Sequence, residues 1–365
     1  PEDSGSNSHP IRPNFYKEIN NFYTPTIYEK GAEFIRMLFN YIGEKPYRKG
    51  IDTYFYLYDG KAVTCENFID ALGKGAKIDL SIFSKWYSQA GTPHIEIKRK
   101  INNTKLSLMI SQKINNEYSN LPIPIKIAFL DQGGHLVDFK INNSTLDKEH
   151  VFLLCNSKET IVIDCEEEKI TPSFLRSFSA PVYLKTDLQE IDYLHILQYD
   201  NDAFNKWDAT QNLYFEHFIR KKDVTPLTEL LKSLISSNSV NNSLMSLLID
   251  LPSRGSLENL LDTVDPIDVF YKRQNLMREI ALNLKTTIEN VALQLARDDI
   301  FLVKNQGQRA LLGKILNYLV LIGSQIGIDL AKRFAISNNM TLSIAALRSL
   351  CLSDSLIAMP YLNKF

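Results

Sequence analysis

The chain has 365 residues, which is more than one hydrophobic core usually serves, so we expect two or three domains. Hydrophobic residues make up 44% and charged residues 23% of the sequence, values that are ordinary for a globular protein. The net charge of −1 and the lack of 18 uninterrupted apolar residues argue against a nucleic-acid partner and against a membrane-spanning helix.

The first part of the chain, residues 1–92, is predicted to be helical after a proline-punctuated loop over residues 1–25. A helix follows with apolar residues at helical spacing from Ile27 to Ile42, and Gly43 is expected to end it. Because this part is only about 90 residues long and has a ragged start, we expect it to be the tail of a larger domain. Further helical patterns cover residues 45–58, 65–74 and 80–89.

The start of the first helix carries a tyrosine whose role the residues alone leave open. Thr26 is predicted to be the N-cap, with Glu29 in capping-box position, and this places Tyr28 in the first turn. A tyrosine there either packs its ring and bonds a backbone group, or points its hydroxyl out of the helix end into a site. Glu29 and Lys30 are expected to serve the helix end rather than the chemistry.

The middle part, residues 93–186, shows apolar residues at a spacing of two. Seven or so short strands separated by turn signals predict a β-sandwich. His94, His135 and His150 lie at expected strand ends or turns without ligand spacing, and we expect them to be surface or hydrogen-bonded residues.

The last part, residues 187–365, returns to helical spacing and keeps it. Asp202 is predicted to cap one helix, and Thr225-Pro226 and Asp265-Pro266 are predicted to be the N-cap and first-turn pairs of two others. Repeated helical hairpins without strands resemble an α-solenoid. The last helical pattern, Thr341 to Leu352, lacks a polar capping repeat, so we expect the array to be truncated. The predicted fold class is therefore α+β multidomain.

The cysteines indicate the cellular compartment, and the first residue indicates a longer parent protein. Four cysteines lie in apolar patterns rather than at framework spacings, and we expect them to be reduced core residues of a cytoplasmic protein. The chain begins at Pro1 without a methionine, and we expect it to be cut from something longer. The cysteines are Cys65, Cys155, Cys165 and Cys351.

Several strings in the chain resemble the zinc aminopeptidases of the aminopeptidase N family, of the bacterial alanyl aminopeptidase type. They are His9 to Pro13, Asn21 to Tyr23, Tyr28 to Ala32, Phe178 to Val182, and Asp202 to Gln211. The resemblance covers nearly the whole chain and implies three domains. Residues 1–92 would be the C-terminal helical part of a thermolysin-like catalytic domain, residues 93–186 an Ig-like β-sandwich, and residues 187–365 the helical array.

The resemblance also implies roles for two tyrosines. In that family the tyrosine of the Tyr-Glu-Lys-Gly-Ala string donates a hydrogen bond to the oxyanion of the tetrahedral intermediate, and here it is Tyr28. Tyr23 resembles the aromatic residue that lines the pocket for the substrate's first side chain, although as a core aromatic it would need no function. Zinc-activated water, with an upstream glutamate as base, would release one amino acid from peptides with a free N-terminus, as in peptide catabolism.

The zinc-binding motif of that family, H-E-x-x-H, does not occur in this sequence. None of the six histidines has a partner at helical ligand spacing, so we expect no metal ligand in this chain. We expect the Zn2+ ligands, and the glutamates that grip the substrate's amine, in a missing N-terminal part of the same protein, and the fragment alone to be inactive. The histidines are His9, His94, His135, His150, His195 and His217.

Two other function classes stay open at this point. The chain would be a non-catalytic scaffold or interaction fragment if the full-length protein also lacked H-E-x-x-H, because a sandwich followed by a helical array is also an interaction architecture. It would be half of a nicked enzyme if the zinc-binding half travelled as another chain. The preferred first side chain of the substrate and the oligomeric state do not follow from the sequence.

Overall fold

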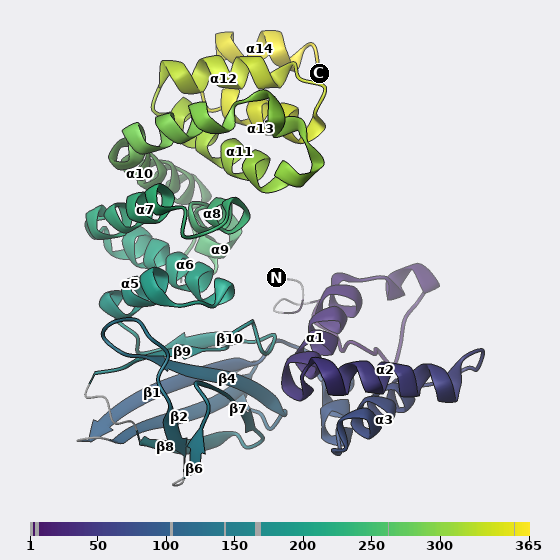
Figure 1. The fold of residues 1–365 in the computed structure, drawn as a ribbon. Helices are drawn as coiled ribbons and strands as arrows, with labels where there is room; N and C mark the ends of the chain where they lie inside the picture. The colour runs from purple at the N-terminus through teal and green to yellow at the C-terminus, as the bar shows by residue number, and fades with distance from the viewer. Residues whose placement is uncertain are drawn as a thin grey trace. The chain divides into compact units, whose positions relative to one another are not determined.

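The computed structural model describes residues 3, 7–102, 105–141, 144–164, 169–261, 263–353 and 355–365. The chain divides into two compact units, Pro1–Gln189 and Glu190–Phe365. Figure 1 shows helices and strands in the first unit, and the described residues of the second unit form helices without strands. Among the described helices, none has the length and apolar character needed to cross a membrane.

The first unit begins with helices that pack around one apolar cluster. Phe34, Met37 and Leu38 on α1 have no exposed surface, because their spacing places them on one face of the helix. Gly43 ends α1 with a φ of +83°, as predicted, since glycine adopts this conformation without strain. The elements are η2 (Ile19–Phe22), η3 (Thr26–Lys30), α1 (Gly31–Ile42), α2 (Glu44–Tyr58), α3 (Cys65–Ala76), η4 (Ser81–Ser84) and α4 (Lys85–Ser88).

The strands of the first unit form two sheets, with orders β10-β1-β2-β8-β5-β6 and β7-β4-β9, and β3 pairs with β2. Burial alternates along β2, as the period of two predicted: Leu106, Leu108 and Ile110 are buried. β1 pairs antiparallel with β2 and parallel with β10. The strands are β1 (His94–Asn102), β2 (Lys105–Ile114), β3 (Glu117–Tyr118), β4 (Ile123–Leu130), β5 (Phe139–Ile141), β6 (Ser144–Leu146), β7 (Glu149–Leu154), β8 (Lys158–Asp164), β9 (Thr171–Phe174) and β10 (Tyr183–Thr186).

The helices and the sandwich of the first unit are joined by polar contacts, one of them buried. The indole of Trp86, which has no exposed surface, donates from Nε1 to the carbonyl oxygen of Pro122 at 2.9 Å. Arg36 and Asn40 on α1 both donate to the carbonyl oxygen of Ser177, at 2.9 and 3.3 Å. These contacts explain why the helical part and the sandwich form one compact unit.

The second unit is an array of helices. Asp202 and Asp265 cap α6 and α10 as predicted: the Asp202 carboxylate accepts from the Asn205 amide at 3.0 Å. The prediction for Thr225 was wrong, because Asp223 accepts from the Thr225 amide at 2.9 Å and Thr225 is already helical. The elements are α5 (Glu190–Tyr199), α6 (Ala203–Arg220), α7 (Thr225–Ser237), α8 (Asn242–Leu248), α9 (Arg254–Glu258), α10 (Pro266–Leu295), η5 (Asp298–Phe301), η6 (Val303–Asn305), α11 (Gln306–Leu321), α12 (Gln325–Ala335), α13 (Met340–Leu350) and α14 (Ser355–Leu362).

The segment after α8 shows how the array satisfies buried backbone groups. Tyr214 donates to the carbonyl oxygen of Leu248 at 2.9 Å, and Tyr318 donates to that of Ile249. Arg273 on α10 donates to the carbonyl oxygen of Pro252 at 2.8 Å. Because buried carbonyl groups are costly without a donor, these side chains fix the segment within the array.

The cysteines differ from the prediction in burial. Cys65, Cys155 and Cys351 are free thiols, but the first two are half-buried and Cys351 is exposed, so they are not core residues. Cys165 lies outside the described residues. The helical array also continues past Leu352, because α14 follows α13.

Candidate active site

Tyr28 lies in the middle of a π-helical turn, η3, that continues directly into α1. The predicted N-cap, Thr26, is wrong: Thr24 is the capping residue, because its Oγ1 accepts from the Ile27 amide at 3.3 Å. Pro25, with a φ of −55°, is already helical, as proline often is at the first position of a helix, and this moves the start upstream. π-Helical turns are rare and occur frequently at functional sites.

Two residues of this turn depart from the capping box that the sequence predicted. Thr26 is only 3% exposed, and its hydroxyl has no hydrogen-bond partner among the residues that the structure describes. Glu29 is exposed, and in the described part of the chain it does not bond back to the Thr26 amide. The capping box is therefore absent from this turn.

Tyr23 and Tyr28 present their rings together on one surface. The rings stack with their centroids 6.2 Å apart and their planes at 21°. Tyr23 is 60% and Tyr28 58% exposed, so neither ring is a core aromatic in this chain. Phe22 packs edge-on against Tyr23 at 6.2 Å, and Tyr16 packs against Phe22 at 5.8 Å. The turn and the segment before it therefore carry a row of aromatic rings, of which Tyr16, Tyr23 and Tyr28 are exposed.

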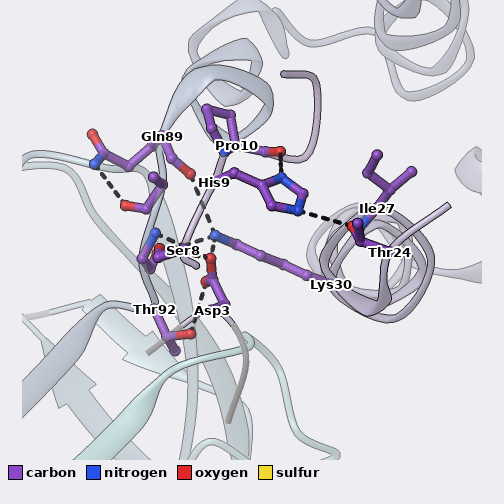
Figure 2. Close-up of polar contacts among 11 residues, drawn as sticks. Asp3, Ser8, His9, Pro10, Thr24, Ile27, Lys30, Gln89 and Thr92 are labelled. Atoms are coloured by element: carbon purple, nitrogen blue, oxygen red, sulfur yellow. Dashed lines mark hydrogen bonds and ion pairs between the residues drawn. The ribbon is translucent and has the colours of Figure 1, made fainter. Parts of the chain in front are cut away.

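His9 holds the start of the turn (Figure 2). Its Nε2 lies 2.9 Å from Oγ1 of Thr24, and its Nδ1 lies 2.8 Å from the carbonyl oxygen of Pro10. Since a carbonyl oxygen only accepts, Nδ1 carries the proton and Nε2 accepts from the Thr24 hydroxyl. The Thr24 oxygen is then free to accept from the Ile27 amide, so one neutral tautomer satisfies all three contacts.

The segment that carries His9 is itself anchored to the helices. Arg12 donates to Glu66 on α3 at 2.6 Å, and the Arg12 amide donates to the carbonyl oxygen of Tyr87 at 2.9 Å. The hydrogen bond from Arg12 lowers the pKa of Glu66 from 4.5 to about 2. Ile11 is buried, and a Cβ atom added to Gly31 would lie 3.6 Å from its Cγ2 atom. The string from His9 to Pro13 is therefore a brace for η3 and α1.

Lys30 fixes the end of the turn through contacts with residues outside the helix, and not by bonding groups at the helix end as predicted. Its Nζ atom reaches Asp3 Oδ2 at 2.8 Å and the carbonyl oxygens of Gly91 and Gln89 at 3.0 and 3.3 Å. Lys30 and Asp3 are 9% and 11% exposed in their side chains, so this is a buried ion pair. Sequence reasoning missed it because Asp3 lies 27 residues from Lys30, beyond any helical or strand spacing.

The described residues do not assemble a metal site. Over the ranges that the structure describes, no three His, Cys, Asp or Glu side chains come together in a way that could hold a metal ion. The site can offer a phenol hydroxyl, aromatic faces and a braced backbone turn.

Three family models match consecutive parts of the chain. Residues 1–87 match the peptidase family M1 domain, residues 91–187 a domain of unknown function with an Ig-like fold, and residues 190–365 a domain of unknown function described as ARM repeats. Aminopeptidase N of Escherichia coli is 30% identical over 371 residues, which cover 95% of this chain and 42% of the relative. Aminopeptidase N of Haemophilus influenzae is 31% identical, with the same two coverages of 95% and 42%. The chain belongs to the aminopeptidase N family.

The family resemblance and the fold class inferred from the sequence are thereby confirmed. A solved structure, Legionella pneumophila aminopeptidase A in complex with aspartic acid, superposes with a TM-score of 0.83 at 26% identity. The match covers 98% of this chain and 43% of that structure. The chain therefore spans less than half the length of these relatives. It comprises the helical end of an M1 domain, an Ig-like domain and an ARM-like helical array.

Proposed function

We propose that the protein containing this chain is a zinc-dependent aminopeptidase that removes the N-terminal amino acid from peptides with a free N-terminus. This chain would supply the oxyanion-stabilising tyrosine, Tyr28. One observation carries the proposal: in a chain of the aminopeptidase N family, the tyrosine of the matching string projects from a rigidly braced π-helical turn with its ring 58% exposed.

The chemistry of Tyr28 suits an oxyanion donor. A phenol is a neutral O–H donor, and it stabilises charge that develops in the transition state when it is aimed at the oxyanion in advance. In the described part of the chain the Tyr28 hydroxyl has no hydrogen-bond partner, so it is free to donate to a ligand. The braces at His9 and Lys30 hold the backbone on either side of it.

Tyr23 would bind the side chain of the first substrate residue. Its ring is stacked on that of Tyr28 and remains 60% exposed, which leaves an apolar ring surface next to the oxyanion donor. A ring in that position favours a substrate through apolar contact rather than through its hydroxyl.

The residues that the structure describes bring no set of ligands together that would fit zinc. We propose that the zinc ligands belong to another part of the protein. On this account the chain alone is inactive, and peptides are the substrates of the full-length enzyme. The domain boundaries near residues 92 and 186 divide the chain into three domains of that enzyme. The cytoplasmic location stays a prediction from the sparse cysteines.

Hydrolysis of an aminoacyl reporter by the full-length protein tests this function. We expect release of the reporter, loss of activity on chelation, and recovery on adding zinc back. A folded, metal-loaded full-length protein that released no reporter from any of a panel of aminoacyl substrates would contradict the proposal. It would favour a scaffold function instead.

A further inference from the structure

Lys30 is the last residue of η3 and lies two residues after Tyr28. Its buried ammonium group contacts three acceptors: one carboxylate oxygen of Asp3 and the carbonyl oxygens of Gln89 and Gly91, at 2.8 to 3.3 Å. An ammonium group has three N–H donors, so these acceptors engage all of them. The side chain is thus held by a complete set of contacts rather than by one surface ion pair.

The acceptors belong to a frame that is itself fixed. Asp3 also accepts from the Gly91 amide at 3.2 Å and from the Thr92 hydroxyl at 3.0 Å. Gly91 has a φ of +84°, and a Cβ atom added there would come within 2.9 Å of Cγ2 of Ile114 on β2. The loop that accepts from Lys30 is therefore seated closely against the sandwich.

The turn needs such a tether because little else fixes the Tyr28 hydroxyl. The ring of Tyr28 is more than half exposed, and it stacks on another exposed ring, that of Tyr23. The position of the hydroxyl therefore depends on the backbone of η3 rather than on packing around the ring. Displacing a reacting group by about 1 Å can cost roughly 100-fold in rate, so the precision of this backbone matters.

We propose that Lys30 is a positioning residue for Tyr28: its three contacts hold the π-helical turn against the loop of residues 89–92, so that the Tyr28 hydroxyl is aimed before substrate binds. The proposal rests on the proposed function of Tyr28 as oxyanion donor. Removing one partner of a buried ion pair leaves the other charge unpaired and lowers stability whatever role the pair has. A purely structural role of Lys30 would therefore lower kcat by the same factor with and without the Tyr28 hydroxyl, whereas a positioning role would lower kcat only when the hydroxyl is present.

A double-mutant cycle in the full-length, zinc-loaded enzyme tests the proposal. Lys30→Met keeps the length of the side chain and removes the three hydrogen bonds. We expect kcat to fall roughly 10- to 100-fold with KM changed by less than about threefold, because the misplaced hydroxyl affects mainly the transition state. In the Tyr28→Phe background the same change should lower kcat by less than about threefold, since no hydroxyl remains to be aimed.

Arg176→Met is the matched structural control. Arg176 is a fully buried cation in the sandwich that donates to Glu149 at 2.7 Å. Its loss should lower the melting temperature but change kcat by less than about twofold, and by the same factor with and without the Tyr28 hydroxyl. Asp3→Asn is the second variant if Lys30→Met does not fold. It removes the charge but keeps an acceptor oxygen, and we expect a smaller fall in kcat that also disappears in the Tyr28→Phe background.

The outcomes separate this inference from the proposed function. If Tyr28→Phe lowers kcat strongly while Lys30→Met lowers it by the same factor in both backgrounds, the residues act independently. Lys30 is then only structural, and the inference is overturned. If Tyr28→Phe itself leaves kcat unchanged, the role of Tyr28 is wrong, and the positioning role of Lys30 fails with it.

Discussion

Removal of the Tyr28 hydroxyl should lower kcat strongly while leaving the stability of the fold nearly unchanged. In Tyr28→Phe the ring and its stacking on Tyr23 remain, and the lost oxygen has no hydrogen-bond partner among the described residues. Because the side chain is 58% exposed, we expect the free energy of unfolding to change by no more than about 0.5 kcal/mol. Deleting one oxyanion donor should lower kcat by roughly 10²–10³-fold, or about 3–4 kcal/mol in the activation free energy.

The assay is steady-state hydrolysis of an aminoacyl reporter by the full-length enzyme, with variants compared at equal zinc content and melting temperature. KM should change little, since the hydroxyl acts chiefly in the transition state. Tyr23→Phe is the control: it removes the same atom from the stacked partner ring, and we expect kcat to stay within about threefold because that ring works through its apolar face. If Tyr28→Phe kept more than about a third of the wild-type kcat, the oxyanion role would be refuted.

Three further predictions follow. This chain expressed alone should bind no stoichiometric zinc and release no reporter, and metal analysis that found one tightly held zinc per chain with hydrolysis would contradict this. Trp86→Phe should lower the free energy of unfolding, measured in urea, by about 2–3 kcal/mol, because it creates a cavity and removes the donor to the Pro122 carbonyl oxygen. A loss below about 0.5 kcal/mol would count against that contact. Burial lowers the pKa of His217 below its ordinary value of 6.5, so the helical array should lose stability as the pH falls below that value. The urea midpoint should therefore fall between about pH 7.5 and about pH 5.5, and it should fall less in His217→Gln. An equal fall in both proteins would refute this reasoning.

The domain order and several helix ends could be predicted because their signals are local. The end of α1 at Gly43 and the caps at Asp202 and Asp265 depend on residues within a few positions of each other. The period of two along the strands is equally local. Such signals are sufficient for the sandwich and the array, and the family strings then indicated Tyr28 and Tyr23.

The braces of the site could not be predicted, because they join residues that are distant in sequence. No periodicity connects His9 with Thr24 or Asp3 with Lys30, and a π-helical turn has no known sequence signature that would place it at Tyr28. The Thr26 cap failed because Pro25 was read as part of the loop rather than as the first helical residue. The helix α14 was missed because its apolar residues lie on all sides and give no stripe.

The most direct test of the central claim is product analysis on a peptide of defined sequence. The full-length protein is incubated with a tetrapeptide and with its N-acetylated counterpart, and the products are followed by mass spectrometry. An aminopeptidase removes single residues in order from the free N-terminus and leaves the acetylated peptide intact. Equal cleavage of both peptides, or cleavage at an internal bond, would contradict the account.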